Sequence, residues 1–121
     1  MLNFNSVLLF SGDPAKLADF YKRVFQSGPG MEDGGYHGFQ VGTGFLTIGP
    51  HDQVSGMSRN PERILLNFET ADVRSEFERI KGLGATVVAE PYQPGEAPGG
   101  WIATFADPDG NYFQLMTPFE M

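Results

Sequence analysis

The strongest constraint on the fold of this 121-residue chain is an internal repeat, because the second half presents the same order of elements as the first. Adding 59 to the residue number carries Asp13 onto Asp72, Tyr21 onto Ile80 and Val24 onto Leu83. A repeated unit that cannot bury its sheet alone packs against a second copy of itself. The sequence therefore predicts two similar modules.

Each module is expected to begin with a strand followed by a helix. Residues 5–11 alternate as a strand does, and residues 63–71 also read as a strand. Asp13 and Asp72 are suited to cap a helix, and apolar residues recur at helical spacing after each. Gly84 is placed to end the second helix.

Further strands complete each module. The predicted strands are residues 35–41, 44–49, 85–88, 101–106 and 111–117, with a loop at 90–100. Thr47 aligns with Gln114 at an offset of 67, and the long loop absorbs the difference from 59. Loops of this length are often lids over binding sites or simply mobile. If this loop covers a binding cleft, Glu90 and Glu96 add negative potential at its mouth.

The segment FADPDGNYFQLM, residues 105–116, has three carboxylate or amide side chains two positions apart, as at the start of a calcium loop. An EF-hand also needs a glutamate at its twelfth position, between two helices. Pro118 stands there instead, and the flanking residues are typical of strands. We expect a hairpin turn in which the Asp107 side chain bonds local backbone and Gly110 accepts a positive φ.

Composition limits the class of partner. Eight Lys and Arg against 15 Asp and Glu give a net charge of −7 and a pI near 4.6. Such a surface disfavours nucleic acid and anionic membranes and favours cationic small molecules. The chain has no cysteine, which is compatible with a cytoplasmic location, and its N-terminal apolar run is too short for a signal peptide or a membrane span.

The segments VLLFSGDPAKLADFYKRVF (7–25) and DPDGNYFQLM (107–116), in this order and spacing, resemble the vicinal oxygen chelate superfamily of glyoxalases, bleomycin resistance proteins and extradiol dioxygenases. The resemblance implies an α+β fold in which two tandem βαβββ modules form a curved mixed sheet around a cleft, within a homodimer. It implies one domain over residues 1–121, with module one at 1–50, a linker at 51–61 and module two at 62–121.

The resemblance also implies where a divalent metal ion would bind, on the first and last strands of each module. The four corresponding positions in this sequence are Ser6, Thr47, Leu65 and Gln114. None supplies the imidazole or carboxylate that such an ion needs, and a leucine has no lone pair to donate. The sequence therefore predicts that the metal site is lost and that no cofactor is bound.

Side chains in a strand alternate between its two faces, so the vacated positions mark the cleft face. The residues of that parity are Phe4, Ser6, Leu8, Phe45, Thr47, Leu65, Asn67, Tyr112, Gln114 and Met116. The opposite parity is almost wholly apolar and is expected under the helices, as Val7, Leu9, Leu46, Ile48, Leu66, Phe68, Phe113 and Leu115. Aromatic and uncharged polar groups together are typical of a small-molecule pocket, although strand aromatics can equally serve core packing.

The predicted ligand-binding residues are Ser6, Phe45, Thr47, Leu65, Asn67, Trp101, Tyr112 and Gln114. We expect a metal-independent, homodimeric protein that binds a cationic or aromatic small molecule, for example an antibiotic. The alternative is a lyase or isomerase of the glyoxalase type, using an unconventional metal or, without metal, His51 or Glu69 as a base. A purely structural module is a third class.

Overall fold

The computed structural model describes residues 1–95 and 99–118, which adopt an α+β fold. The chain divides into two compact units, Met1–Gly56 and Met57–Met121. The division falls inside the segment 51–61 that the sequence predicts as a linker. Within the described residues, no helix is long and apolar enough to cross a membrane.

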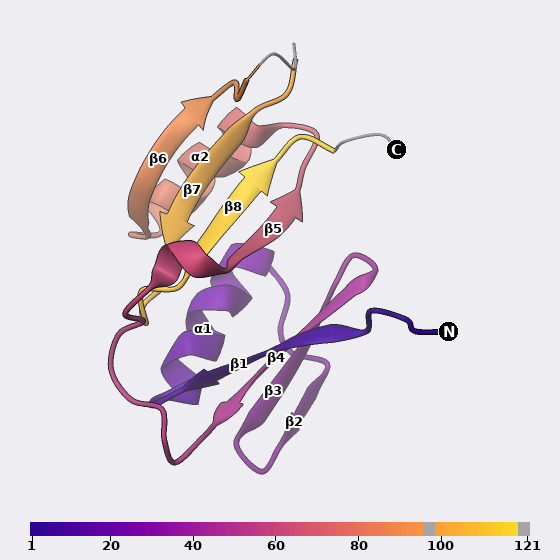
Figure 1. Ribbon diagram of the computed structural model, residues 1–121, viewed down its shortest axis with the longest axis vertical. Coiled ribbons are helices and arrows are strands. Elements are labelled where there is room, and N and C mark those ends of the chain that lie inside the picture. The colour runs from indigo at the N-terminus through magenta and orange to yellow at the C-terminus, as the bar shows by residue number, and fades with distance from the viewer. Residues whose placement is uncertain (96–98, 119–121) are drawn as a thin grey trace. The chain divides into compact units, whose positions relative to one another are not determined.

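The first unit is a βαβββ module with a four-stranded mixed sheet in the order β1-β4-β3-β2 (Figure 1). β1 runs parallel to β4, and the other neighbouring strands are antiparallel. Its elements are β1 (Ser6–Ser11), α1 (Pro14–Phe25), β2 (Met31–Asp33), β3 (Tyr36–Val41) and β4 (Gly44–Pro50).

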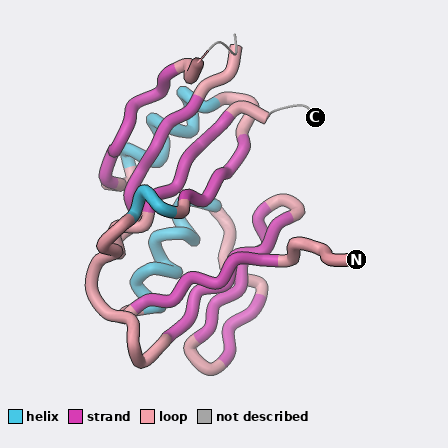
Figure 2. Tube along the Cα trace, viewed as in Figure 1, coloured by secondary structure: helices cyan, strands magenta, loops and turns pink. Residues whose placement is uncertain are grey.

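The second unit repeats this topology, with the sheet order β5-β8-β7-β6 and β5 parallel to β8 (Figure 1). Figure 2 shows the same chain coloured by secondary structure, with helices in cyan and strands in magenta. A single 3₁₀ turn, η1 (Pro61–Arg63), precedes it. Its elements are β5 (Leu65–Glu69), α2 (Val73–Gly82), β6 (Thr86–Tyr92), β7 (Ile102–Ala106) and β8 (Tyr112–Met116). The tandem βαβββ arrangement predicted from the sequence is confirmed.

Both helices begin as predicted. The Asp13 carboxylate accepts a hydrogen bond from the Lys16 backbone N–H at 3.2 Å, and the Asp72 carboxylate accepts one from the Ser75 N–H at 3.0 Å. Each contact satisfies one of the backbone donors that a helix leaves unpaired at its start. Gly84, just after α2, has φ of +91°, which is the conformation that favours glycine at a helix end.

In each unit the helix covers one face of its own sheet (Figure 1). The covered faces form the cores, and their predicted members Leu46, Ile48, Phe113 and Leu115 are buried. Phe39 and Tyr21 are buried in the first core, and Phe77 and Phe105 stack in the second. In the described part of each unit no helix of that unit covers the opposite face, and we call it the open face.

Several element boundaries differ from the prediction. Residues 31–33, predicted as loop, form β2 because they pair with β3. β6 continues to Tyr92, although residues 90–92 were predicted as loop; it is an edge strand with two register shifts, where Pro91 is tolerated. β5 begins at Leu65 instead of residue 63, because η1 occupies the preceding residues.

The turn between β7 and β8 is the one predicted. The buried Asp107 carboxylate accepts hydrogen bonds from the Asp109 N–H at 2.9 Å, the Asn111 N–H at 3.0 Å and the Asn111 side-chain amide. Gly110 has φ of +80°. The carboxylate is therefore engaged within the turn, as the sequence predicts.

The predicted linker is shared between the units. A Cβ at Gly12 would lie 3.2 Å from the Ser55 Cα, so the end of the first unit approaches the β1–α1 turn closely. The Ser58 N–H donates to the Asp109 carbonyl at 2.8 Å, so the next residues belong to the second unit. These local contacts explain why the units divide at residue 56.

Candidate functional site

The open face of the second unit presents three rows of side chains that run across its four strands. The middle row contains Asn67, Gln114, Thr104 and Ala89. One flanking row contains Leu65, Tyr112, Ala106 and Thr86, and the other contains Glu69, Met116, Ile102 and Tyr92. The register thus brings four predicted ligand-binding residues together on one surface, with a polar row between less polar ones.

Gln114 is held by a residue that the sequence analysis missed. Its Nε2 donates a hydrogen bond to Thr104 Oγ1 at 3.2 Å, across the β7–β8 pair. Thr104 is only 5% exposed, so this contact lies at the base of the face. Thr104 shares the parity of Ile102 and Ala106, and that alternation was the signal that could have identified it.

The open face of the first unit is more apolar. Ser6 pairs with Phe45 and Leu8 with Thr47 in the parallel β1–β4 ladder, so three predicted ligand-binding residues lie together here. Leu8 and Phe45 are each 47% exposed, which is high for such large apolar side chains.

Two glycines shape this first face. The Tyr36 ring occupies the space that a Cβ at Gly49 would take, so the ring lies directly over the backbone of β4. Met31 similarly covers Gly38, where a Cβ would lie 3.2 Å from the methionine methyl group. Tyr36 and Met31 therefore contribute to this surface, although the sequence analysis did not select them.

Trp101 lies apart from the other predicted ligand-binding residues. It precedes β7, and its backbone pairs with Thr117 through two hydrogen bonds of 2.9 and 3.1 Å. The Arg74 guanidinium of α2 lies 4.2 Å from the centre of the indole ring. By the alternation along β7, Trp101 belongs with Ala103 and Phe105 to the helix-covered face of the sheet. This cation–π contact joins α2 to the start of β7.

The two predicted base candidates have different surroundings. The His51 ring packs edge-on against Phe10, with 4.9 Å between ring centres, and its Nδ1 accepts the Gln53 N–H at 3.0 Å. Glu69 is exposed at the end of β5 and lies on the open face beside Met116. A role of either residue as a base stays a prediction.

The other histidine, His37, lies on the helix-covered side of the first sheet. Its Nδ1 is 3.6 Å from the Glu32 carboxylate of β2. Together with Lys22 and Asp19 of α1, these residues border a shallow hollow of about 180 Å³. The hollow is separate from the open face of the same unit.

The residues at the implied metal positions do not fit a divalent ion. Gln114 already bonds Thr104, Leu65 has no donor atom, and the Ser6 and Thr47 hydroxyls are neutral. Nowhere among residues 1–95 and 99–118 do three His, Cys, Asp or Glu side chains gather in a group that could hold a metal ion. A desolvated divalent cation would therefore meet too little compensating charge here.

The predicted acidic lid is only partly described. Glu90 is exposed on β6, while Glu96 lies outside the described residues. The cleft that the sequence predicts also stays a prediction. The described residues provide two separate candidate binding surfaces, the open face of each unit.

Comparisons with solved structures identify proteins of the same fold. An enzyme of the glyoxalase/bleomycin resistance protein/dioxygenase family from Burkholderia phytofirmans is 21% identical, with a TM-score of 0.76 over 95% of this chain and 98% of that one. A glyoxalase-related enzyme from Fulvimarina pelagi is 20% identical, with a TM-score of 0.76 over 98% and 89%. The fosfomycin resistance protein FosX from Mesorhizobium loti is 21% identical, with a TM-score of 0.70 over 98% and 95%.

At these identities the solved structures establish the fold alone. No curated protein sequence matches the chain significantly. The family model of the glyoxalase-like domain matches residues 6–116, which span every strand and both α-helices. The chain therefore belongs to the glyoxalase-like domain family, and its fold is the one seen in the solved glyoxalase/bleomycin resistance protein/dioxygenase structure.

Proposed function

We propose that this protein binds a small organic molecule without the help of a metal ion. The observation that carries the proposal is the open face of the second unit, where neutral Leu65 and Gln114 stand at the implied metal positions. Asn67 and Tyr112 on the same face supply hydrogen-bonding and stacking groups. A few polar groups among apolar and aromatic ones are the usual composition of a ligand site.

The expected ligand is aromatic or cationic. Exposed Phe45 and Leu8 on the first open face, and Tyr112 on the second, offer surfaces on which a planar ring can stack. Each such contact is worth on the order of 1 kcal/mol, so useful affinity needs several of them. Antibiotics are one class to include, because the solved structures of this fold include fosfomycin resistance proteins.

Thermal unfolding of the purified protein with a panel of aromatic, cationic and antibiotic compounds, with EDTA present, tests the proposal. A compound that raises Tm in a concentration-dependent way supports it, because a ligand that binds only the folded state stabilises that state. Tyr112→Ala should reduce the shift, and Val88→Ala, at an exposed position on the edge strand β6 outside the three rows, serves as the control. If no compound stabilises the protein, the proposal is wrong.

We also propose a homodimer, as the family resemblance implies. Light scattering after size-exclusion chromatography should give twice the 13.3 kDa mass of the chain. A mass of 13.3 kDa at micromolar concentration would contradict the dimer but not the ligand site. The cytoplasmic location expected from the composition stays a prediction.

A further inference from the structure

We infer that the ligand carries a primary or secondary ammonium group and that Gln114, on the open face of the second unit, receives it. This inference rests on the proposed function and names the chemistry of its ligand. Three observations support it: the distribution of basic residues, the direction of the Gln114 amide, and the carboxylate of Glu69 on the same face.

All eight Lys and Arg residues lie outside the strands. Six belong to α1 and α2, one to η1 and one to the linker: Lys16, Lys22, Arg23, Arg74, Arg79, Lys81, Arg63 and Arg59. Every strand residue is described, and the only charged side chains on the second sheet are Glu69 and Glu90. The potential at this sheet is therefore negative, which favours a cation over an anion of the same shape.

The hydrogen bond to Thr104 fixes the orientation of the Gln114 side-chain amide. Since Nε2 donates to the buried Thr104 hydroxyl, the carbonyl oxygen Oε1 has no partner among the described residues. A ligand that meets Gln114 therefore meets an acceptor, and it must bring an N–H or O–H donor. Asn67, the direct cross-strand neighbour of Gln114, is exposed and can supply a second amide oxygen.

Glu69 supplies the charge. It lies two residues beyond Asn67 on the same face of β5, about 7 Å along the strand, and the described residues show no ion pair for it. An ammonium group bonded to Gln114 thus lies close enough to the Glu69 carboxylate for electrostatic attraction. The Tyr112 ring, in the opposite flanking row, adds a π-face to which a cation is attracted.

An ammonium group suits this set of residues where a divalent ion does not. It carries a single charge, keeps part of its hydration, and binds through directional N–H donors. The neutral amide oxygens of Gln114 and Asn67 can accept its N–H groups, and the carboxylate of Glu69 balances its single charge. The same residues that exclude a metal ion thus favour an organic cation.

Four probes of similar size separate charge from hydrogen bonding: phenethylamine, its N,N,N-trimethyl analogue, 2-phenylethanol and 3-phenylpropanoate. Their binding is followed by ¹⁵N NMR of the side-chain amide groups of Gln114 and Asn67. We expect phenethylamine to shift both amides and to bind at least about fivefold more tightly than the alcohol. The trimethyl analogue, which has the charge but no N–H, should bind more weakly than the amine.

Single-residue variants show which side chains account for the affinity for the amine. Gln114→Met keeps the length of the side chain but removes the acceptor, so amine affinity should fall about tenfold. Alcohol affinity should fall less, because a hydrogen bond from an uncharged O–H is weaker than one from an ammonium group. Glu69→Gln should lower amine affinity about two- to fivefold, and less at high salt. Glu78→Gln, which removes an exposed carboxylate from α2, is the matched control and should have no effect. Asn67→Ala, at an exposed position, provides a second variant if Gln114→Met fails to fold.

The outcomes are distinguishable. If 3-phenylpropanoate binds as tightly as the amine, the Gln114 amide presents its NH₂ group instead, and the ammonium inference is wrong. The inference is also wrong if none of the probes shifts either amide while other compounds stabilise the protein; the proposed binding function then stands. If no compound of any class binds, the binding function itself is wrong.

Discussion

At the scale of single residues, two positions show how one side chain or its absence shapes the chain. Asp107 is 4% exposed, and its carboxylate organises the turn before β8. Gly49 has no side chain, and the Tyr36 ring lies in the space left open. Both effects depend on a single atom or group, so both can be tested by one substitution.

Asp107→Ala should lower the free energy of unfolding by about 2–3 kcal/mol, because it leaves buried N–H groups of the turn without acceptors. Urea denaturation measures the change. Asp109→Ala is the control: its side chain has no hydrogen bond among the described contacts, and its carbonyl remains to accept the Ser58 N–H. Equal losses for the two variants would contradict the role given to the Asp107 carboxylate.

Gly49→Ala should cost about 1–3 kcal/mol of stability, because the added Cβ collides with the Tyr36 ring. Gly44→Ala, where the nearest atom would be the Val41 carbonyl oxygen at 3.6 Å, should change stability by less than about 0.5 kcal/mol. In a Tyr36→Ala background, Gly49→Ala should cost less than it does alone. Additive costs would show that the ring does not cause the strain.

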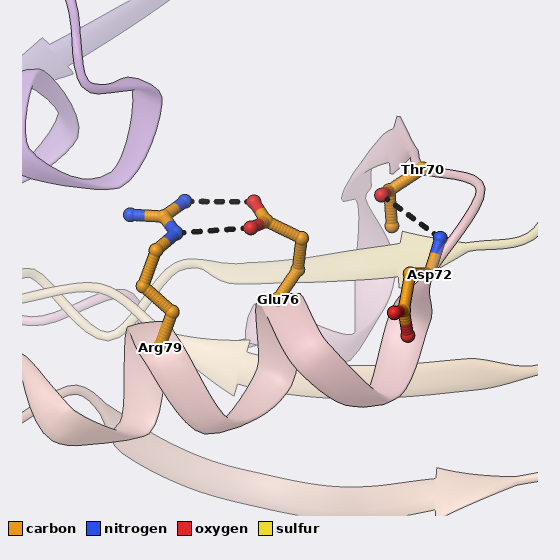
Figure 3. Close-up of polar contacts among 4 residues, drawn as sticks. All are labelled: Thr70, Asp72, Glu76 and Arg79. Atoms are coloured by element: carbon orange, nitrogen blue, oxygen red, sulfur yellow. Dashed lines mark hydrogen bonds and ion pairs between the residues drawn. The ribbon is translucent and has the colours of Figure 1, made fainter.

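At the scale of elements, α2 shows how local contacts fix a helix. Figure 3 shows the Asp72 N–H donating to Thr70 Oγ1 before the helix, at 3.3 Å, and the Arg79 guanidinium facing the Glu76 carboxylate one turn along. The Arg79 Nε and Nη2 atoms donate to the two Glu76 oxygens at 3.0 and 2.8 Å. These hydrogen bonds from Arg79 lower the pKa of Glu76 below its ordinary value of 4.5.

The Glu76 contribution to stability should depend on pH. Because the pKa is lower in the folded state, the contribution is complete above pH 4.5 and disappears as the pH falls through the folded-state pKa. The pair is partly exposed, so Glu76→Gln should cost only about 0.5 kcal/mol at pH 7. Urea denaturation at pH 7 and at pH 3 should show a smaller difference between variant and wild type at pH 3. A constant difference would contradict the ion pair as its source.

At the scale of the whole molecule, the most general expectation concerns metals. After incubation with Ni²⁺, Mn²⁺ or Zn²⁺ and dialysis, the protein should retain no stoichiometric metal, and EDTA should not lower its Tm. The reason is the neutral set Ser6, Thr47, Leu65 and Gln114. Mass spectrometry of the metal content measures the result. One metal ion per chain, lost together with stability on adding EDTA, would overturn the metal-independent function.

Much of the fold could be predicted from the sequence. Helix starts at Asp13 and Asp72, the turn at Asp107 and the alternation along β5 and β8 all follow from contacts between near neighbours in the chain. β2 could not be predicted in this way. Its three residues are exposed and carry no periodic pattern, and they form a strand only because β3 offers a partner.

The candidate site could be predicted only in part. Parity placed Asn67, Tyr112 and Gln114 on one face, but it did not show that Thr104 bonds Gln114. Trp101 was grouped with them by residue type, whereas its ring stacks with Arg74 of α2. Residue type indicates that an aromatic ring will make contacts with other groups. The register of its strand decides on which face of the sheet those contacts lie.

The sequence by itself determined the repeated βαβββ order, the caps and turns, and the loss of the metal donors, because these depend on residue identity and on spacing along the chain. The tertiary structure alone decided which strands pair and in what register. Cross-strand contacts join residues distant in the sequence, and a shift of one residue would exchange the two faces of a strand. Gln114 therefore meets Thr104 at the base of the open face only because β7 and β8 align as they do.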